Sequence, residues 1–169
     1  MEKLNISSVL LDDFDFSRFS KLKELDCSNC NLRTLKPASM PSLEKLICSG
    51  NLLDTLNLSR LSGLKHLDCS SNSIQTLKLP DTRSLNILYC QNNLLTKLNL
   101  SGFSSLKKLN CSDNKLLEPD LRNCFLEELI CNDNVIRTPM EFYDLSRAKQ
   151  TDKPSVLGKL WTSGVMDFL

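Results

Sequence analysis

One pattern of residues recurs along this chain at a fixed spacing, and that spacing constrains the fold more than any other feature. The segment from Leu85 to Leu100 reads LNILYCQNNLLTKLNL, which has the form L-x-x-L-x-C-x-x-N-x-L-x-x-L-x-L. The same form begins at Leu64 and at Leu43, so the period is 21 residues. A constant period in this range is typical of a solenoid, in which each repeat forms one coil and stacks on its neighbours.

The repeat covers most of the chain, with irregular copies near both ends. Full copies begin at Leu22, Leu43, Leu64, Leu85, Leu106 and, one residue early, Leu126. Residues 1–21 keep the register in a degenerate form, with Ile6 in place of Cys and Val9 in place of Asn, and we interpret them as an N-terminal capping coil. Pro119 predicts an irregular arc in the shortened coil, because proline cannot donate a ladder hydrogen bond. The predicted solenoid spans residues 1–138.

Each repeat predicts two extended segments joined by a turn. In its first part, as in Leu88-Tyr89-Cys90, inward and outward residues alternate with the period of two that indicates a strand. Equivalent strands of successive coils must then lie parallel, about 4.8 Å apart. The Asn at the ninth position, such as Asn93, can turn the chain and satisfy backbone groups with its amide. The second part, such as Thr55-Leu56-Asn57-Leu58, predicts a short strand or extended segment on the opposite side.

The repeat stops after Ile136, and residues 139–169 predict a helical cap. Thr138-Pro139-Met140-Glu141 has the form of a capping box, which predicts a helix over residues 139–148. A second helical stretch begins at Pro154 and carries Trp161 on its apolar face. We expect these helices to cover the open end of the last coil, with Trp161 packed there rather than docking a partner.

The cysteines form a series that packing explains better than chemistry does. The chain has eight cysteines, and six of them occupy one repeat position: Cys27, Cys48, Cys69, Cys90, Cys111 and Cys131. Metal ligands converge on a point, whereas this series spreads along a line, so we expect free thiols in the core, no metal site and no cofactor. Cys27 and Cys30 form a C-x-x-C sequence without the βαβ context of a redox motif. Stacked free thiols fit a reducing compartment.

The pattern L-x-x-L-x-[L/C]-x-x-[N/C]-x-L resembles the leucine-rich repeat family over about residues 1–140. The 21-residue period with Cys at the second strand position is similar to bacterial members, some of which are effectors delivered into host cells. The resemblance implies an α/β-type repeat solenoid that is mostly β and coil: a right-handed arc with a parallel concave sheet and short extended segments on its convex side. It also implies a protein-binding platform. Cys30 departs from the usual Asn, and 169 residues leave no room for an appended ligase domain.

The outward strand positions are the predicted partner-binding site, because they vary where the core positions repeat. Ile87 and Tyr89 are apolar at positions where solvent is expected, and such side chains among polar groups suit the centre of an interface. The alternative is that single exposed apolar residues are ordinary. His66 lacks an oriented nucleophile and an oxyanion site, so we expect no enzyme activity. The predicted partner-binding residues are Ile47, His66, Asp68, Ile87, Tyr89, Lys108, Asn110 and Ile130.

Composition and charge limit the classes of partner. The net charge of +1 gives no electrostatic case for nucleic acid or an anionic membrane. No apolar run reaches the roughly 20 residues that a membrane helix needs. The first residues, MEKLNISSVLLDDFDF, do not resemble a classical signal peptide, so we expect a cytoplasmic location, or the host cytosol for a delivered effector.

Two functions remain open from the sequence. The favoured one is a monomeric, non-catalytic module that binds a partner protein on its concave face. The other is a structural scaffold that self-associates through an edge or its C-terminal segment, without a ligand on the concave face.

Overall fold

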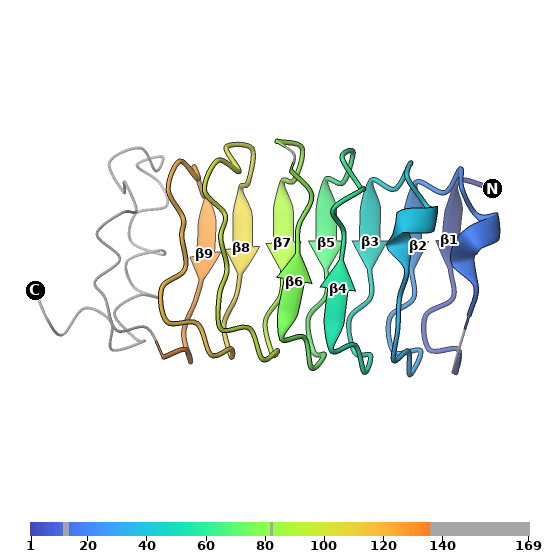
Figure 1. The fold of residues 1–169 in the computed structure, drawn as a ribbon, viewed down its shortest axis with the longest axis horizontal. Helices are drawn as coiled ribbons and strands as arrows, with labels where there is room; N and C mark the ends of the chain where they lie inside the picture. Colours follow the sequence, from blue (N-terminus) through green and yellow to red (C-terminus); the bar gives the residue numbers. More distant parts are fainter. Residues whose placement is uncertain (12–13, 82, 136–169) are drawn as a thin grey trace, which may run out of the picture.

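The chain forms a single stack of coils, and one strand of each coil joins a parallel sheet that runs the length of the stack (Figure 1). The structure is a computed structural model, and it describes residues 1–11, 14–81 and 83–135. The predicted parallel sheet and solenoid are confirmed. The strands follow chain order, apart from two that lie on the other side of the stack: β1 (Lys3–Asn5), β2 (Glu24–Asp26), β3 (Lys45–Ile47), β5 (His66–Asp68), β7 (Ile87–Tyr89), β8 (Lys108–Asn110) and β9 (Glu128–Ile130).

The register of this seven-stranded sheet follows the sequence period. Leu46 of β3 pairs with Leu67 of β5, which pairs with Leu88 of β7, each step being 21 residues. Between β8 and β9 the step falls to 20, since Leu109 pairs with Leu129. The shortened coil therefore keeps its strand in line, and the missing residue is taken from the connection that precedes β9.

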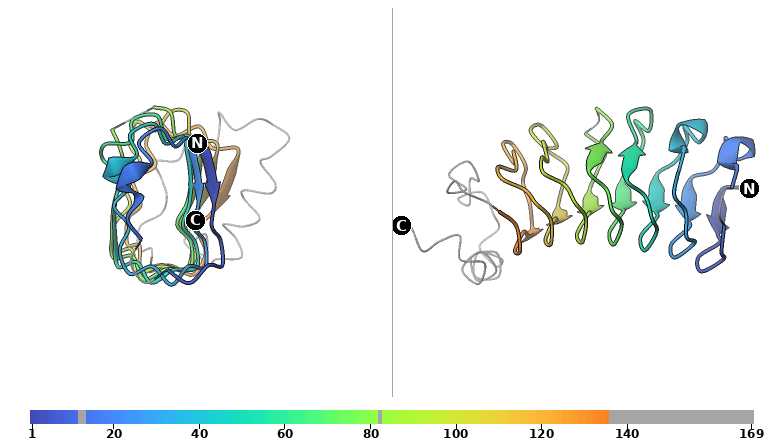
Figure 2. Two further views of the ribbon diagram at one scale, coloured as in Figure 1. Left: turned by 90° about the vertical axis from the view of Figure 1, so that its right-hand side faces the viewer. Right: turned by 60° about the horizontal axis from the view of Figure 1, so that its bottom comes forward.

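The opposite side of each coil, which we call the reverse face, is less regular. It holds a two-stranded parallel sheet of β4 (Thr55–Asn57) and β6 (Thr76–Lys78), which confirms the predicted second extended segment. Nearer the N-terminus this side holds two 3-10 turns, Phe16–Arg18 and Pro37–Ser39. In the shortened coil only an isolated bridge between Asn99 and Asp120 remains, as the proline at position 119 predicts. Figure 2 shows both sides of the stack.

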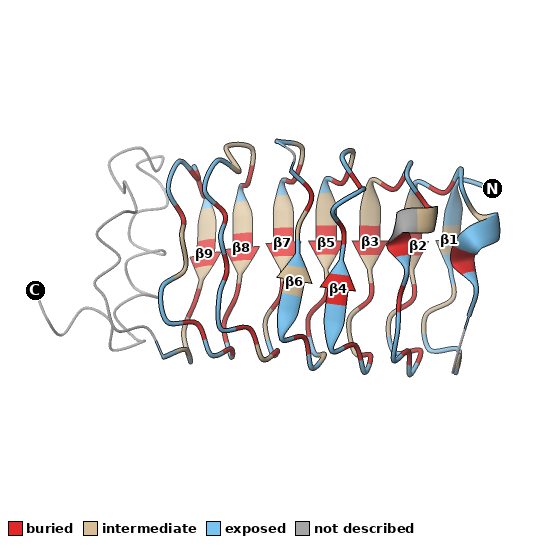
Figure 3. Cartoon of the chain, viewed as in Figure 1, coloured by how far each residue is buried: buried red, intermediate tan, exposed pale blue. Residues whose placement is uncertain are grey.

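The core lies between the two faces and is continuous along the stack. The middle residue of every strand from β2 to β9 in the main sheet points inward and is buried, and its two neighbours are half-buried (Figure 3). Leu67 and Leu88 are fully buried. Burial of a leucine side chain contributes about 1.5–3 kcal/mol, so the repeated leucines supply most of the stabilisation of each coil.

A ladder of asparagine side chains fastens the coils at the turn after each strand. The Asn93 amide donates to the carbonyls of Cys90 in its own coil, at 3.2 Å, and of Cys69 in the coil before, at 3.0 Å. Its oxygen accepts a bond from the Ile74 N–H at 2.9 Å. The same arrangement recurs at Asn51, Asn72, Asn114 and Asn134. The prediction that this residue satisfies backbone groups at the turn is confirmed.

The residue before each ladder position has a left-handed backbone. Its φ lies between 52° and 66° at Ser8, Asn29, Gly50, Ser71, Asn92, Asp113 and Asp133. Only glycine and residues with short polar side chains reach this region readily. This explains why that column holds Gly, Asn, Asp and Ser although it faces no partner in the core.

All eight cysteines are free and buried, which confirms the core packing predicted for the six at one repeat position. Burial raises the pKa of the Cys27 thiol to about 12, and it raises the pKa of Cys90 well above its ordinary value. Cys30 occupies a ladder position and donates its S–H to the Ile6 carbonyl at 3.0 Å, which is the bond that an asparagine amide makes in later coils. Protonated, buried thiols are poor nucleophiles.

The N-terminal coil continues the stack, since β1 pairs with β2, but it packs less completely. Phe16 is buried, whereas Val9, Leu10 and Phe14 are exposed. The Phe14 ring contacts the Phe16 ring, with the centroids 4.7 Å apart. Among the described residues this coil has a neighbour on one side only, and the coil at the end of a solenoid is expected to pack less completely.

The predicted helical cap at 139–169, with Trp161, lies outside the described residues, as do the last residues of the predicted solenoid. Among the described residues, no helix is long and apolar enough to cross a membrane.

Candidate functional site

The structure brings all eight predicted partner-binding residues onto the solvent side of five adjacent strands, which we call the sheet face. Strand pairing aligns them in two rows. The first row holds His66, Ile87 and Lys108, and the second holds Ile47, Asp68, Tyr89, Asn110 and Ile130. The rows follow from the period of two within each strand and the constant register between strands.

The apolar members of these rows are less exposed than the sequence predicts. Ile47, Ile87, Tyr89 and Ile130 are half-buried, and so are the polar residues beside them. These apolar side chains lie on the solvent side of the sheet, as expected, but a smaller fraction of each is exposed than the sequence predicts. Strands about 4.8 Å apart hold neighbouring side chains against one another, so each covers part of the next.

His66, Ile87 and Tyr89 form the central cluster of the sheet face. The His66 and Tyr89 rings meet edge to face, with centroids 6.0 Å apart and planes at 89°. Ile87 pairs with His66 across the strands and shares a face with Tyr89 on β7. Burial lowers the pKa of His66, and the charge of Lys45 adds to that effect, so the ring is neutral at neutral pH. The cluster offers an aromatic and aliphatic surface without a charge at its centre.

Asp68 and Asn110 are held by their own coils. The Asp68 carboxylate accepts bonds from the Ser70 N–H at 3.0 Å and the Ser70 hydroxyl at 2.7 Å. The Asn110 side-chain oxygen accepts the equivalent bonds from Ser112, at 3.1 and 2.9 Å. These oxygens close the turn that follows the strand, in the manner of an Asx turn. The series of serines at this repeat position, which the sequence indicates to be structural or filler, thus closes turns in these coils.

Along the whole stack, the repeat position of the second row holds two kinds of residue: polar residues that bond to a following serine, and apolar residues. Asn5, Asp26, Asp68 and Asn110 all bond to the serine two residues later. Ile47, Tyr89 and Ile130 cannot make this bond, and their side chains are left on the sheet face. The apolar residues are thus the members of the row whose side chains close no turn.

Gln91 is a feature of the same coil that the sequence analysis did not single out. It replaces the serine two residues after Tyr89, and its side-chain oxygen is buried without a hydrogen-bond partner among the described residues. A buried acceptor without a partner is rare and costly. The replacement of serine by glutamine at this repeat position, two residues after the tyrosine, is the signal that could have identified it.

Charged residues border the cluster and are largely paired with each other. Lys108 contacts Glu128 at 3.3 Å, and its hydrogen bond and charge interaction with Glu128 raise the pKa of Lys108. Just before the strands, Lys65 contacts Glu44 at 2.7 Å and Lys107 contacts Glu127 at 3.7 Å. Lys45 forms no ion pair within the described part of the chain. Paired charges leave the apolar cluster as the main feature that a ligand of this face would meet.

Hydroxyl and thiol groups near the cluster are engaged within the fold. The Ser70 hydroxyl donates to Asp68, and the cysteine thiols lie in the core with raised pKa values. Across residues 1–11, 14–81 and 83–135, no three metal-ligating side chains come together.

Comparisons with known proteins agree with this fold. The sequence model of the Leucine Rich Repeat matches residues 21–43 and 63–85. The functional domain of InlJ from Listeria monocytogenes, which includes a cysteine ladder, is similar to 79% of this chain with a TM-score of 0.59 and 25% identity. Two further structures share the fold: TLR13 in its complex with ssRNA13, at 21% identity, 86% coverage and a TM-score of 0.53, and the leucine-rich repeat domain of APL1B, at 18%, 88% and 0.52.

The chain is shorter than each of these structures. It spans 35% of the InlJ chain, 27% of the TLR13 chain and 60% of the APL1B chain. No curated protein sequence matches it. The comparisons thus bear on the repeat and the fold, and the partner has to be argued from this chain's own surface.

Proposed function

Because this chain is a leucine-rich repeat protein, we propose that it is a non-catalytic module that binds a partner protein on its sheet face. The observation that supports this most is the cluster of His66, Ile87 and Tyr89 on two adjacent strands. Among the seven described strands, Ile87 is the one apolar residue of its row, and Tyr89 lies in the row that also holds Ile47 and Ile130. Aromatic and aliphatic side chains surrounded by polar groups are typical of binding hot spots.

The proposed contact residues fall into two groups. Ile47, His66, Ile87, Tyr89 and Ile130 would supply the apolar contact. Asp68, Asn110 and Lys108 would contribute less, because their polar atoms already bond within the protein. The partner should therefore present an apolar centre rather than a strongly charged surface.

Capture of partners from a lysate by the immobilised protein tests this proposal. The variant I87A/Y89A/K108A should retain the fold and lose the captured protein, with Kd at least about tenfold weaker once that protein is purified, since hot-spot truncation costs roughly 2 kcal/mol or more. The matched control is T55A/R60A, two exposed residues on the reverse side. Equal capture by the triple variant and the control would rule out the sheet face as the site.

Self-association is a second candidate, favoured by the N-terminal coil. Within the described residues β1 pairs with β2 alone, and Val9, Leu10 and Phe14 are exposed beside it. An open strand edge next to apolar side chains can pair with a second copy. Sedimentation over a range of concentrations separates the two functions: a monomer throughout contradicts the scaffold, whereas a dimer that L10K abolishes would support it.

We further propose that the protein works in a reducing cytosol. Eight free, buried cysteines are the composition expected where thiols stay reduced. The likeness to a Listeria protein with a cysteine ladder supports a bacterial source, and delivery into a host cell belongs to the same proposal. A cytosolic reporter fused to the chain, assayed in host cells exposed to the source bacterium, tests delivery, and a reporter that never leaves the bacterium contradicts it.

A further inference from the structure

On the reverse face the described coils pair at two places only, and the interval between those two places has no strand pairing. β4 pairs with β6, and further along Asn99 bridges Asp120, but β6 has no strand partner on its other side within the described residues. Figure 1 shows the wider spacing beside β6. The two coils concerned are joined without interruption in the main sheet, where β5 pairs with β7. The coils therefore separate on the reverse face only.

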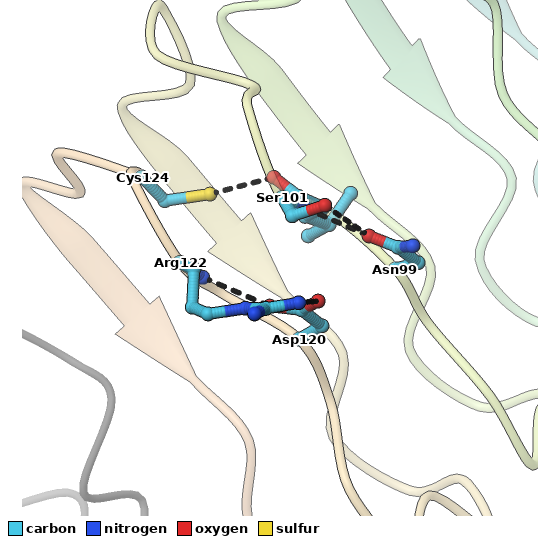
Figure 4. A network of polar contacts seen from close by, with 6 residues as sticks. Asn99, Ser101, Asp120, Arg122 and Cys124 are labelled. Atoms are coloured by element: carbon cyan, nitrogen blue, oxygen red, sulfur yellow. Dashed lines mark hydrogen bonds and ion pairs between the residues drawn. The ribbon is translucent and has the colours of Figure 1, made fainter.

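The cause is a local change in the repeat. The coils on either side carry Asn57-Leu58-Ser59 and Asn99-Leu100-Ser101, and in both the asparagine oxygen accepts the serine N–H, at 3.1 and 2.9 Å. Figure 4 shows the turn of Asn99 and Ser101. The coil between them carries Lys78-Leu79-Pro80 at the same positions. Lysine offers no acceptor, and proline has no N–H to donate. The turn that closes the neighbouring coils cannot form here.

A groove of about 390 Å³ opens at this point. Leu77, Leu79, Pro80 and Phe103 supply its apolar lining, and Asp81 and Lys97 stand on its opposite walls. Leu77 and Leu79 are half-buried, whereas the equivalent leucines at positions 56 and 58 are fully buried. Protein sites for small ligands occupy roughly 300–1,000 Å³, so this groove suits a short segment.

Backbone groups of the residues that line the groove lack, within the described part of the chain, the inter-coil hydrogen bonds found in the next interval. In the next interval the Leu100 N–H donates to the Asp120 carbonyl at 2.8 Å, and the Asp120 N–H donates to the Leu98 carbonyl at 2.9 Å. The equivalent bonds would join Leu79 to Asn99 and Asn99 to Leu77, and the described residues do not make them. Donors and acceptors therefore alternate along the groove, and these partial charges are complementary to the backbone of an extended peptide.

We propose that this groove binds an extended peptide, which adds a strand beside β6 and places an apolar side chain among Leu77, Leu79 and Phe103. The peptide would accept from the Leu79 N–H and donate to the Leu77 carbonyl. A small apolar molecule could fill the same space but would leave these backbone groups unpaired. The site is separate from the sheet face and does not depend on the function proposed for that face.

The test uses the full chain and a capped peptide, acetyl-Thr-Leu-Asn-Leu-Ser-amide, which copies residues 55–59, the segment on the other side of β6. Nuclear magnetic resonance should show the amides of Leu79 and Asn99 shifting as the peptide is added. A peptide with N-methyl groups in place of its central N–H groups should bind at least about tenfold weaker, because one or two hydrogen bonds are lost. Equal binding of the two peptides would show that the groove recognises only apolar side chains and would overturn the proposal.

A variant that closes the groove provides the second arm. K78N/P80S restores the Asn-x-Ser turn of the neighbouring coils and should abolish peptide binding without loss of stability. R33A, at an exposed position in the coil of β2, should bind the peptide as the natural sequence does. Undiminished binding by K78N/P80S, shifts confined to β1 or the sheet face, or no binding at millimolar peptide would each overturn the proposal. So would concentration-dependent shifts of the Leu79 and Asn99 amides without peptide, which would identify a second copy as the occupant.

Discussion

The sheet face and the reverse face are built from the same repeats, yet one is continuous and the other is interrupted. On the sheet face every adjacent pair of coils is joined by strand pairing, with a register of 21 or 20 residues. On the reverse face pairing is confined to β4 with β6 and to one isolated bridge. A fixed period in the sequence therefore does not ensure equal spacing on both sides of a coil.

The difference comes from what holds each side. Next to the sheet, the buried asparagine ladder bonds each coil to the one before it, so a coil cannot move away without breaking several hydrogen bonds. On the reverse side, the side-chain oxygens of Asn57 and Asn99 accept bonds only within their own coils, and both residues are exposed. A change of two residues at positions 78 and 80 is then enough to part the coils there.

The largest expected effect is the loss of a ladder asparagine. N93A removes the acceptor for the buried Ile74 N–H and one of the two asparagine donors to each of the Cys69 and Cys90 carbonyls, so we expect the free energy of unfolding to fall by about 2–4 kcal/mol. Urea denaturation followed by circular dichroism measures it. The matched control, N57A on the reverse face, should cost no more than about 1 kcal/mol. Similar losses in the two variants would remove the distinction between the faces.

A smaller effect is expected when the interruption is copied to a second place. N57K/S59P gives the coil of β4 the residues found at positions 78 and 80, and it should part β4 from β6 at a cost of about 1–2 kcal/mol, the range for loss of a side-chain cap. Hydrogen exchange at the Leu58 N–H, which now donates to the Lys78 carbonyl at 2.8 Å, should become faster. The Cys69 N–H, in the main sheet, should exchange at its original rate. Unchanged exchange at Leu58 would mean that the Asn-x-Ser turn does not set the spacing.

The smallest effect concerns His66. Burial, with the charge of Lys45, lowers its pKa in the folded protein, so the unfolded chain binds the proton more readily. The contribution of His66 to the free energy of unfolding is therefore fully present above its ordinary pKa of about 6.5. It declines as the pH falls through the lowered pKa of the folded protein. The effect should be well under about 1.4 kcal/mol, the free energy of one pKa unit, because the ring is partly exposed. The difference in stability between the natural sequence and H66Q, measured from pH 7.5 to 5, should change in this direction, and a constant difference would contradict it.

Much of the fold could be predicted from the sequence because its determinants repeat. The leucine positions, the buried cysteines and the ladder asparagines each recur at one place in the period, so a single reading applies to every coil. The irregular arc at Pro119 was also predictable, because proline lacks the N–H that a ladder needs.

The contacts between surface side chains could not be predicted from the sequence in the same way. The half-burial of Ile47 and Tyr89 depends on how side chains of different coils lean on each other, which the period does not determine. The bonds that Asp68 and Asn110 accept from the serines two residues later could have been inferred from the recurring Asx-x-Ser sequence. Because Asp68 and Asn110 are polar and point outward, the sequence instead predicts contacts to a partner. Prediction of the groove would have required a comparison of Lys78-Leu79-Pro80 with the coils on both sides. The backbone groups that lack inter-coil bonds are visible only in the structure.

The left-handed residue before each ladder position also bears on how such a chain can change over time. Each coil carries its own copy of this constraint, so a duplication of 21 residues inherits a complete turn and needs no adjustment elsewhere. A point mutation to valine or isoleucine at Asn92 or Asp113 would instead be selected against, since a branched side chain is strained at positive φ. We therefore expect this protein to vary more readily in the number of its coils than in the residues of that column.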